Sequence, residues 1–339
     1  MTSSVLERAR GGDEQAFREF TRPYLRELHL HCYRMLGSLV DSEDLLQETL
    51  LAAWRGLDGF AGRSSCRAWL YRIATNRCLN AIRDGKRRPP VPPVPPFSPP
   101  DPSRHGELTW LQPYPDAWLD QLPDAALEPA AKYEARAGVE LAFIAALQRL
   151  PPRQTAAVVL ADVLGFSTSE VARMLESSPT AVKGVLQRGR ATLERHRTAA
   201  GHDPVGGRGS AVERDLASRF AVAFTAGDIN SVVALLTDDA WLAMPPAPHE
   251  YVGCAAVAGF LRISTAGREQ RRLRLVPTRA NGQPAFSCHL GRPDQPSDLA
   301  GVLVLTMSRD RISGITRFLD SDLQRQFERA DAAVTSWTP

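Results

Sequence analysis

The sequence of 339 residues is long enough for two or three domains. Its 43% hydrophobic and 23% charged residues are ordinary for a globular protein, and a net charge of +3 means that any nucleic-acid surface must be local. Five scattered cysteines form no C-x-x-C pair, which argues against a zinc site or a disulfide framework, and no apolar run suits a signal peptide or a membrane span. We expect a cytoplasmic protein with no metal, no cofactor and no membrane contact.

Residues 5–88 are predicted to form a helical domain. One of its helices spans 41–55, where Asp41 or Ser42 can cap the start and nearby acidic side chains favour the positive N-terminal end of the helix. The outer side of its first turns is acidic or amide-bearing and is a candidate protein-docking surface: Asp41, Glu43, Asp44, Gln47 and Glu48.

A glycine-punctuated loop, 56–65, and a basic helix, 66–83, follow the acidic helix. Arginines with nearby aromatic rings suit a nucleic-acid strand, because phosphates pair with guanidinium groups and unstacked bases stack on rings. Phe60 and Trp69 serve equally well as core of a small bundle, and this alternative stays open. The candidate strand-binding residues are Phe60, Arg63, Arg67, Trp69, Arg72, Asn76 and Arg83.

Residues 89–136 are predicted to be a linker. Its first part, 89–102, is so rich in proline that neither helix nor sheet can form, so it should be an extended spacer. Its second part is acidic yet carries Trp110, Tyr114 and Trp118. Because plain disordered linkers are poor in aromatic residues, we expect this part to dock on a folded surface.

Residues 137–198 are predicted to end in two helices joined by a tight turn. Ser167 and Glu170 have the spacing of a capping box at the first helix, and Ser178 with Pro179 suits the start of the second. Such a pair predicts a helix-turn-helix, whose second helix enters the DNA major groove. An ordinary helical hairpin with a solvated basic face is the alternative.

The second of these helices has an apolar side and a polar, basic side. At about 100° per residue, Val182, Val185 and Leu186 share the apolar side. On the polar side, Lys183 and Gln187 are the best candidates for contacts to base edges, and the arginines suit phosphates. The candidate DNA-binding residues are Thr180, Lys183, Gln187, Arg188 and Arg190.

A glycine-rich stretch, 199–210, precedes a third domain at 211–328. Helices are predicted first and then strands over 271–277, 284–290, 301–308 and 311–318, which makes an α+β domain. No catalytic residue is assigned, because paired Asp238 and Asp239 more often cap or turn. The candidate cavity-lining residues are Trp241, Met244, His249, Tyr251, Asn281 and Phe318.

The chain resembles bacterial RNA polymerase sigma factors of the extracytoplasmic-function (ECF) group, within the sigma-70 family. Three phrases occur in the family's order: DSEDLLQETLLAAW, CRAWLYRIATNRCLNAIRD and LPPRQTAAVVLADVLGFSTSEVARMLESSPTAVKGVLQRGRATL. The resemblance implies that the acidic helix docks on the polymerase β′ clamp helices. It also implies that the loop and basic helix open and bind the −10 promoter element, that the helix-turn-helix binds the −35 element, and that the linker threads polymerase channels.

The third domain is similar to the SnoaL-like, nuclear transport factor 2-like fold, in the phrases AGDINSVVALLTDDAWLAMPPAP, RANGQPAF and ITRFLD. Certain ECF sigma factors carry such a domain at the C-terminus, and it implies a cavity inside a curved sheet. We therefore expect a sigma factor that directs promoter-specific initiation and is modulated in cis by this domain. Its partners would be core RNA polymerase (β′ clamp and β subunit), promoter DNA and a small-molecule ligand. A ligand-responsive helix-turn-helix regulator and a sigma factor fused to an active enzyme are the alternatives.

Overall fold

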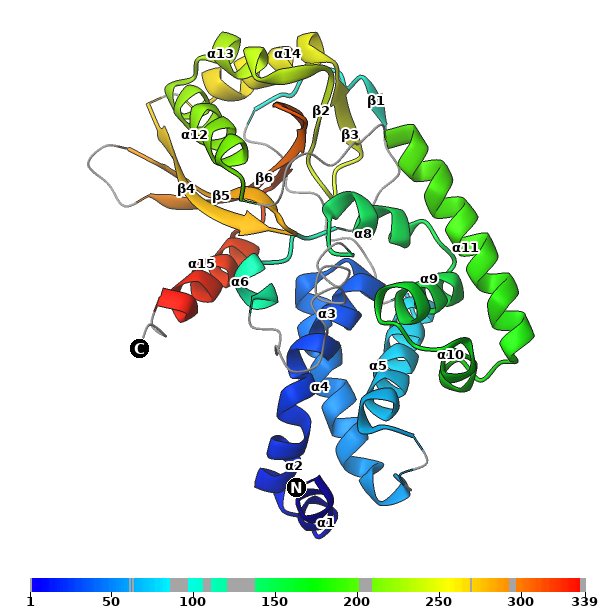
Figure 1. Cartoon of the computed structure of the whole chain (residues 1–339). Helices are drawn as coiled ribbons and strands as arrows, with labels where there is room; N and C mark the ends of the chain where they lie inside the picture. Colours follow the sequence, from blue (N-terminus) through cyan, green and yellow to red (C-terminus); the bar gives the residue numbers. More distant parts are fainter. Residues whose placement is uncertain are drawn as a thin grey trace. The chain divides into compact units, whose positions relative to one another are not determined.

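The computed structural model describes residues 2–60, 62, 64–85, 97–105, 111–120, 138–200, 209–268, 270–292 and 297–335. The chain forms two compact units, Met1–Arg88 with Trp118–Ala199, and Pro89–Ala117 with Ala200–Pro339. The first unit is helical and the second is built on a sheet (Figure 1). The expected linker is thus shared between the units, and most of its proline-rich part lies outside the described residues.

The first half of the helical unit is organised around α3, in which every residue from Glu27 to Leu36 is buried. Helices α4 and α5 both pack on α3. Helix α4 begins at Leu39, earlier than expected, because the Ser38 hydroxyl accepts a hydrogen bond from the Asp41 backbone N–H at 3.1 Å. The elements of this half are α1 Thr2–Arg10, α2 Glu14–Thr21, η1 Arg22–Tyr24, α3 Leu25–Leu36, α4 Leu39–Arg55, η2 Leu57–Gly59 and α5 Cys66–Arg83.

The second half of this unit ends in the expected pair of helices. The capping box of Ser167 and Glu170 is present, and the Ser178 hydroxyl accepts from the Ala181 backbone N–H at 3.1 Å at the start of the next helix. Glu176 takes the positive φ of 49° that the tight turn requires. The elements are α8 Leu141–Gln148, α9 Pro152–Val158, the π-turn η4 Val159–Val163, α10 Thr168–Met174 and α11 Pro179–Ala200.

The second unit contains a seven-stranded sheet in the order β1-β3-β2-β7-β6-β5-β4. The pair β2–β7 is parallel and all other neighbours are antiparallel. The four expected strands are present. Three of them are longer than expected and β7 has the expected bounds, whereas β1, β2 and β3 were not predicted. The strands are β1 Arg104–His105, β2 Leu236–Ala243, β3 His249–Val252, β4 Arg272–Ala280, β5 Gln283–Gly291, β6 Asp298–Ser308 and β7 Arg311–Phe318.

Strand β6 is buried on both faces of this sheet. Its residues Leu303 and Leu305 belong to the core formed with α12, α13 and α14, whereas Val302 and Val304 alternate with them and are also buried. Helix α15 packs on β6 and β5. The helices are α12 Ala211–Ala226, α13 Ile229–Ala234, α14 Cys254–Ala266 and α15 Ser321–Thr335. The short helix α6, Asp116–Leu119, contains the boundary between the two units, which falls after Ala117.

The expected fold class, helical parts followed by an α+β part, is confirmed. In the part of the chain that the structure describes, no helix combines the length and the hydropathy needed to cross a lipid bilayer.

Candidate nucleic-acid interface

Helix α11 presents a polar face to solvent. Val182 and Leu186 are buried, while Thr180, Lys183, Gln187 and Arg188 are all exposed. The exposed residues recur at helical spacing, so they lie on one side of the helix. The geometry therefore gives α11 a continuous face of hydrogen-bonding side chains, and the DNA major groove is wide enough to admit an α-helix.

Arg190 differs from the other expected α11 contacts. Its Nε donates to Asp162 Oδ2 at 2.9 Å and its Nη2 donates to Asp162 Oδ1 at 2.5 Å. This two-point ion pair fastens α11 to η4 and holds the guanidinium group. A DNA phosphate that contacts Arg190 would have to share its guanidinium group with Asp162.

The outer side of α5 carries the expected basic side chains. Arg72 is exposed, Asn76 is half-buried, and the exposed Arg83 pairs with Asp84 at 3.0 Å. Arg63 lies outside the described residues. Arg77 is also exposed on α5, so the cationic surface of this helix in the described chain is formed by Arg72, Arg77 and Arg83.

Phe60 and Trp69 are not exposed platforms. They are 7% and 6% exposed, and their ring centroids lie 4.9 Å apart in the interior of the helical unit. Of the two alternatives that the sequence left open for these residues, the burial agrees with core packing, because the two rings pack on each other. Stacking of a DNA base on either ring requires this packing to open.

Arg67 is also engaged inside the unit. Its Nε donates to Glu27 Oε2 at 3.0 Å, and its guanidinium carbon lies 5.0 Å from the ring centre of Tyr71 and 4.7 Å from that of Phe166. The Tyr71 hydroxyl donates to the same Glu27 oxygen at 3.2 Å. Because Phe166 directly precedes the capping residue of α10, this cluster joins α5 to the helix-turn-helix.

The outer face of α4 combines acidic, amide and apolar groups. Glu43, Asp44 and Gln47 are exposed, whereas Asp41 and Glu48 are half-buried. Leu51 is 56% exposed at the same helical spacing. Leu51 thus adds an apolar group to this acidic face, and the sequence pattern alone did not distinguish it from a core position.

The C-terminal cavity is not where the sequence placed it. Of the six expected lining residues only Met244 borders the cavity, which has a volume of about 290 Å³. Trp241 packs instead against Gly314, where an added Cβ would meet the indole at 2.5 Å. Phe318 is buried in β7 outside the lining.

The other three expected lining residues hold the linker. The Tyr251 hydroxyl donates to the Pro100 carbonyl at 2.9 Å, and His249 pairs with His105 in the β1–β3 ladder. The Asn281 side-chain oxygen accepts from the Tyr114 backbone N–H at 2.7 Å, and the Asn281 N–H donates to the Tyr114 carbonyl at 2.9 Å. The aromatic residues of the linker predicted such docking but not its location.

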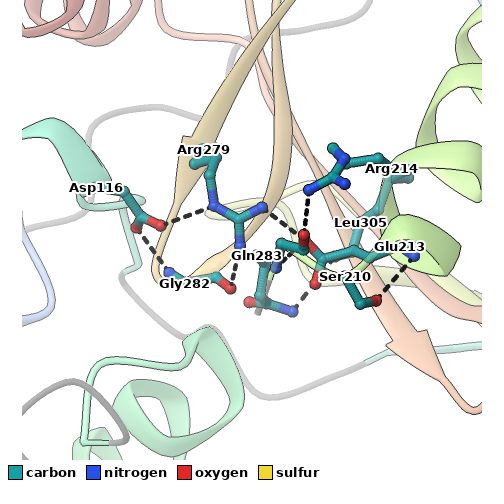
Figure 2. Close-up of polar contacts among 9 residues, drawn as sticks. Asp116, Ser210, Glu213, Arg214, Arg279, Gly282, Gln283 and Leu305 are labelled. Atoms are coloured by element: carbon teal, nitrogen blue, oxygen red, sulfur yellow. Dashed lines mark hydrogen bonds and ion pairs between the residues drawn. The ribbon is translucent and has the colours of Figure 1, made fainter. Parts of the chain in front are cut away.

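An ion-pair network completes the attachment of the linker to the sheet (Figure 2). Arg279 on β4 lies between two carboxylates, with Nη1 at 2.6 Å from Glu213 and Nε at 3.3 Å from Asp116 of the linker. Asp116 also accepts from the Gly282 backbone N–H at 2.7 Å. The pKa of Arg279 is raised despite the burial of the group, because these carboxylates favour its charged form.

Comparison with known proteins places these surfaces in a family context. Residues 20–88 match Sigma-70 region 2 and residues 140–193 match Sigma-70, region 4. The chain is 41% identical over 322 residues to the ECF RNA polymerase sigma factor SigG of Mycobacterium tuberculosis, covering 93% of this chain and 84% of SigG. It is 32% identical over 184 residues to SigM of that species, covering 54% of this chain and 78% of SigM.

A solved structure also matches most of the chain in fold. The crystal structure of the M. tuberculosis ECF sigma factor SigJ matches with a TM-score of 0.55 at 20% sequence identity, covering 90% of this chain and 96% of SigJ. At this identity the likeness is one of fold.

Proposed function

The chain belongs to the ECF RNA polymerase sigma factors, and we propose that three of its helices divide the work of promoter-specific initiation. In this proposal α4 docks on the polymerase β′ clamp, α5 binds the −10 element and α11 binds the −35 element. The exposed Glu43, Asp44 and Leu51 support the first role. The solvent-facing Lys183 and Gln187 support the third, because lysine pairs with guanine and glutamine with adenine in the major groove.

We further propose that the C-terminal domain modulates initiation in cis by holding the linker. The observation that carries this proposal is the attachment of residues 97–105 and 111–117, which lie between the two Sigma-70 regions in sequence. Linker strand β1 adds to the edge of the sheet beside β3, and Tyr114 is buried against Asn281. A segment bound in this way is withheld from polymerase channels, so docking opposes initiation.

The strength of the attachment suits a switch. The hydrogen bonds of Asn281 and Asp116, with the partly exposed Arg279 ion pair, contribute about 1 to 3 kcal/mol. A change of that size alters an equilibrium about 5- to 150-fold. Loss of these contacts should therefore shift the equilibrium between docked and released linker without unfolding the domain.

The test combines Asn281→Gly with Asp116→Ala. Glycine tolerates the positive φ of 55° at position 281, so the first change removes the amide without straining the turn. Hydrogen exchange of residues 97–117 should accelerate in the full chain. Run-off transcription with core polymerase, from a promoter found by genome-wide occupancy, should rise when sigma factor is limiting.

Arg309→Gly is the matched control, because Arg309 has the same φ of 55° in the β6–β7 turn. It should leave both readouts unchanged. Accelerated exchange with unchanged or reduced transcription would contradict modulation through the linker. Unchanged exchange would show that these contacts do not hold the linker.

For the C-terminal domain we propose ligand binding and no catalytic step. The described lining of the cavity carries arginine and serine as its polar residues and offers neither a carboxylate nor an imidazole. General acid–base catalysis at neutral pH depends most often on such groups. Asp238 and Asp239 are exposed, and Asp320 accepts from the Asp322 and Leu323 backbone N–H groups at the start of α15.

A further inference from the structure

The cavity of the C-terminal domain has an apolar body. It lies in the second unit, and its walls include Phe224 of α12, Phe260 of α14, and Leu273 and Leu303 of the sheet. Its volume of about 290 Å³ is near the lower end of the range for small-molecule sites. Walls of this kind suit a short aliphatic or aromatic group.

Arginines give the same cavity a cationic end. Arg268, Arg271 and Arg317 all belong to its lining. Among the described residues, no ion pair joins any of the three to a carboxylate. Arg317 donates to the Cys288 sulfur and, at 2.6 Å, to the Ala300 carbonyl, which are neutral acceptors.

Arg268 makes weak contacts with neutral groups at this end of the cavity. Its guanidinium carbon lies 5.1 Å from the ring centre of Phe224, and its Nη1 has the Phe224 carbonyl at the long distance of 3.4 Å. Burial, followed by repulsion from Arg317, lowers the pKa of Arg268 to about 10. Two half-buried cations that repel each other favour an anion between them.

The linker supplies part of the cavity wall. Phe97 lines the cavity, and its ring meets that of Phe260 edge to face with centroids 5.7 Å apart. An added Cβ at Gly267 would lie 3.1 Å from the Phe97 Cβ, so the linker is seated close to the C-terminal end of α14. A molecule in the cavity therefore touches the linker and the domain at once.

We propose that this cavity binds a small monocarboxylate with an apolar body, and that the bound molecule holds the linker in its docked position. The carboxylate pairs with Arg268 and Arg317, since a planar guanidinium group matches carboxylate geometry. The apolar body lies against Phe97, Phe260 and Leu303. The proposed ligand class concerns the cavity alone. The proposed effect of the ligand on the linker rests on the cis modulation proposed above.

Calorimetry on the full chain tests the ligand class with octanoate, 1-octanol and octylamine as probes. Octanoate should bind at one site at least tenfold more tightly than 1-octanol, and octylamine should not bind. This ranking uses the unmodified protein, so it holds whether or not a variant folds. Equal binding of octanoate and 1-octanol would overturn the assignment of the anion site.

Arg268→Met should weaken octanoate at least tenfold and leave 1-octanol unchanged. Arg262→Met is the matched control, because Arg262 lies on α14 outside the cavity lining and is exposed. A folded Arg268→Met variant that binds octanoate as the unmodified chain does would refute the role of Arg268.

The coupling to the linker needs a separate readout. Octanoate should slow hydrogen exchange of residues 97–105 and reduce run-off transcription, and both effects should be lost in Arg268→Met. Tight octanoate binding without these effects would overturn the coupling and leave the ligand class standing. Failure of octanoate to bind, while Asn281→Gly with Asp116→Ala still raises transcription, would overturn the ligand class and leave the cis modulation standing.

Discussion

The contact between Arg67 and Phe166 should couple Sigma-70 region 2 and region 4 energetically. Arg67 is 25% exposed, and its guanidinium group lies over the Phe166 ring at 4.7 Å. A cation–π contact in a partly desolvated setting is worth about 1 to 2 kcal/mol. Arg67→Met and Phe166→Leu each remove this contact, but Arg67→Met also leaves the buried Glu27 without its arginine.

A double-mutant cycle separates the contact from that side effect. Urea unfolding of the unmodified chain, both single variants and the double variant gives a coupling energy, in which the shared cost at Glu27 cancels. We expect about 1 to 2 kcal/mol for Arg67 with Phe166, and less than about 0.5 kcal/mol for Arg67 with the control Val182→Ala on α11. A coupling energy near zero for the first pair would refute a role of Arg67 in joining the two regions.

The same variants distinguish two functions of Arg67. If its main function is to join the regions, Phe166→Leu and Arg67→Met should both increase promoter binding, because each loosens the packed arrangement. If Arg67 mainly contacts DNA at the −10 element, Arg67→Met alone should reduce promoter opening. Permanganate footprinting of the opened strand measures that outcome.

Other surfaces give further predictions. Lys183→Ala should reduce the binding free energy by about 1 to 3 kcal/mol at one position of the −35 element and relax the base preference there. An equal loss of affinity on every sequence, measured by competition binding, would assign Lys183 to a phosphate contact. Asp44→Arg should weaken binding to core polymerase while binding to an isolated −35 duplex persists. Unchanged affinity for core polymerase would show that the docking surface lies elsewhere. Burial lowers the pKa of His29 to about 4 and of His31 to about 3. Because the unfolded chain then binds protons more readily, stability is full above about pH 6.5 and falls as pH decreases, by about 2 kcal/mol per imidazole at pH 5. Urea unfolding across this range checks the slope, and a flat profile would contradict the neutral, buried imidazoles.

The sequence predicted best where local chemistry decides the structure. Ser167 and Glu170 form the expected capping box because both partners lie within one helical turn. The dense valine and leucine content of residues 299–307 predicted a buried strand, and Val302 to Leu305 are buried on alternate faces of β6. In both cases a short segment contains the full physical cause.

Side chains whose roles depend on distant partners were harder to place. Tyr251 and Asn281 have the composition of cavity-lining residues, yet their partners Pro100 and Tyr114 lie more than a hundred residues earlier in the chain. The cavity arginines gave no sequence signal either, since Arg268 and Arg317 meet only when β7 lies next to the helical layer. Phe60 and Trp69 show the same limit, because an aromatic on a loop cannot be assigned to surface or core without knowing what covers it.

Promoter binding requires the two regions of the helical unit to separate. In the proposed function α5 and α11 bind elements whose position numbers differ by 25, which corresponds to about 85 Å at roughly 3.4 Å per base pair. In the packed unit, by contrast, Arg67 of α5 lies over the ring of Phe166 beside the helix-turn-helix. Simultaneous contact with both elements therefore needs this cluster to break and the chain between the regions to extend.

The docked linker limits that extension. Residues 97–117 amount to about 70 Å of fully extended chain at roughly 3.3 Å per residue, and the C-terminal domain holds the segment through β1, Tyr114 and Asp116. The reach withdrawn by docking is thus comparable to the spacing of the promoter elements. A ligand that strengthens docking at Phe97 would oppose promoter binding even though it touches neither α5 nor α11, and polymerase would have to displace the linker before both elements are bound.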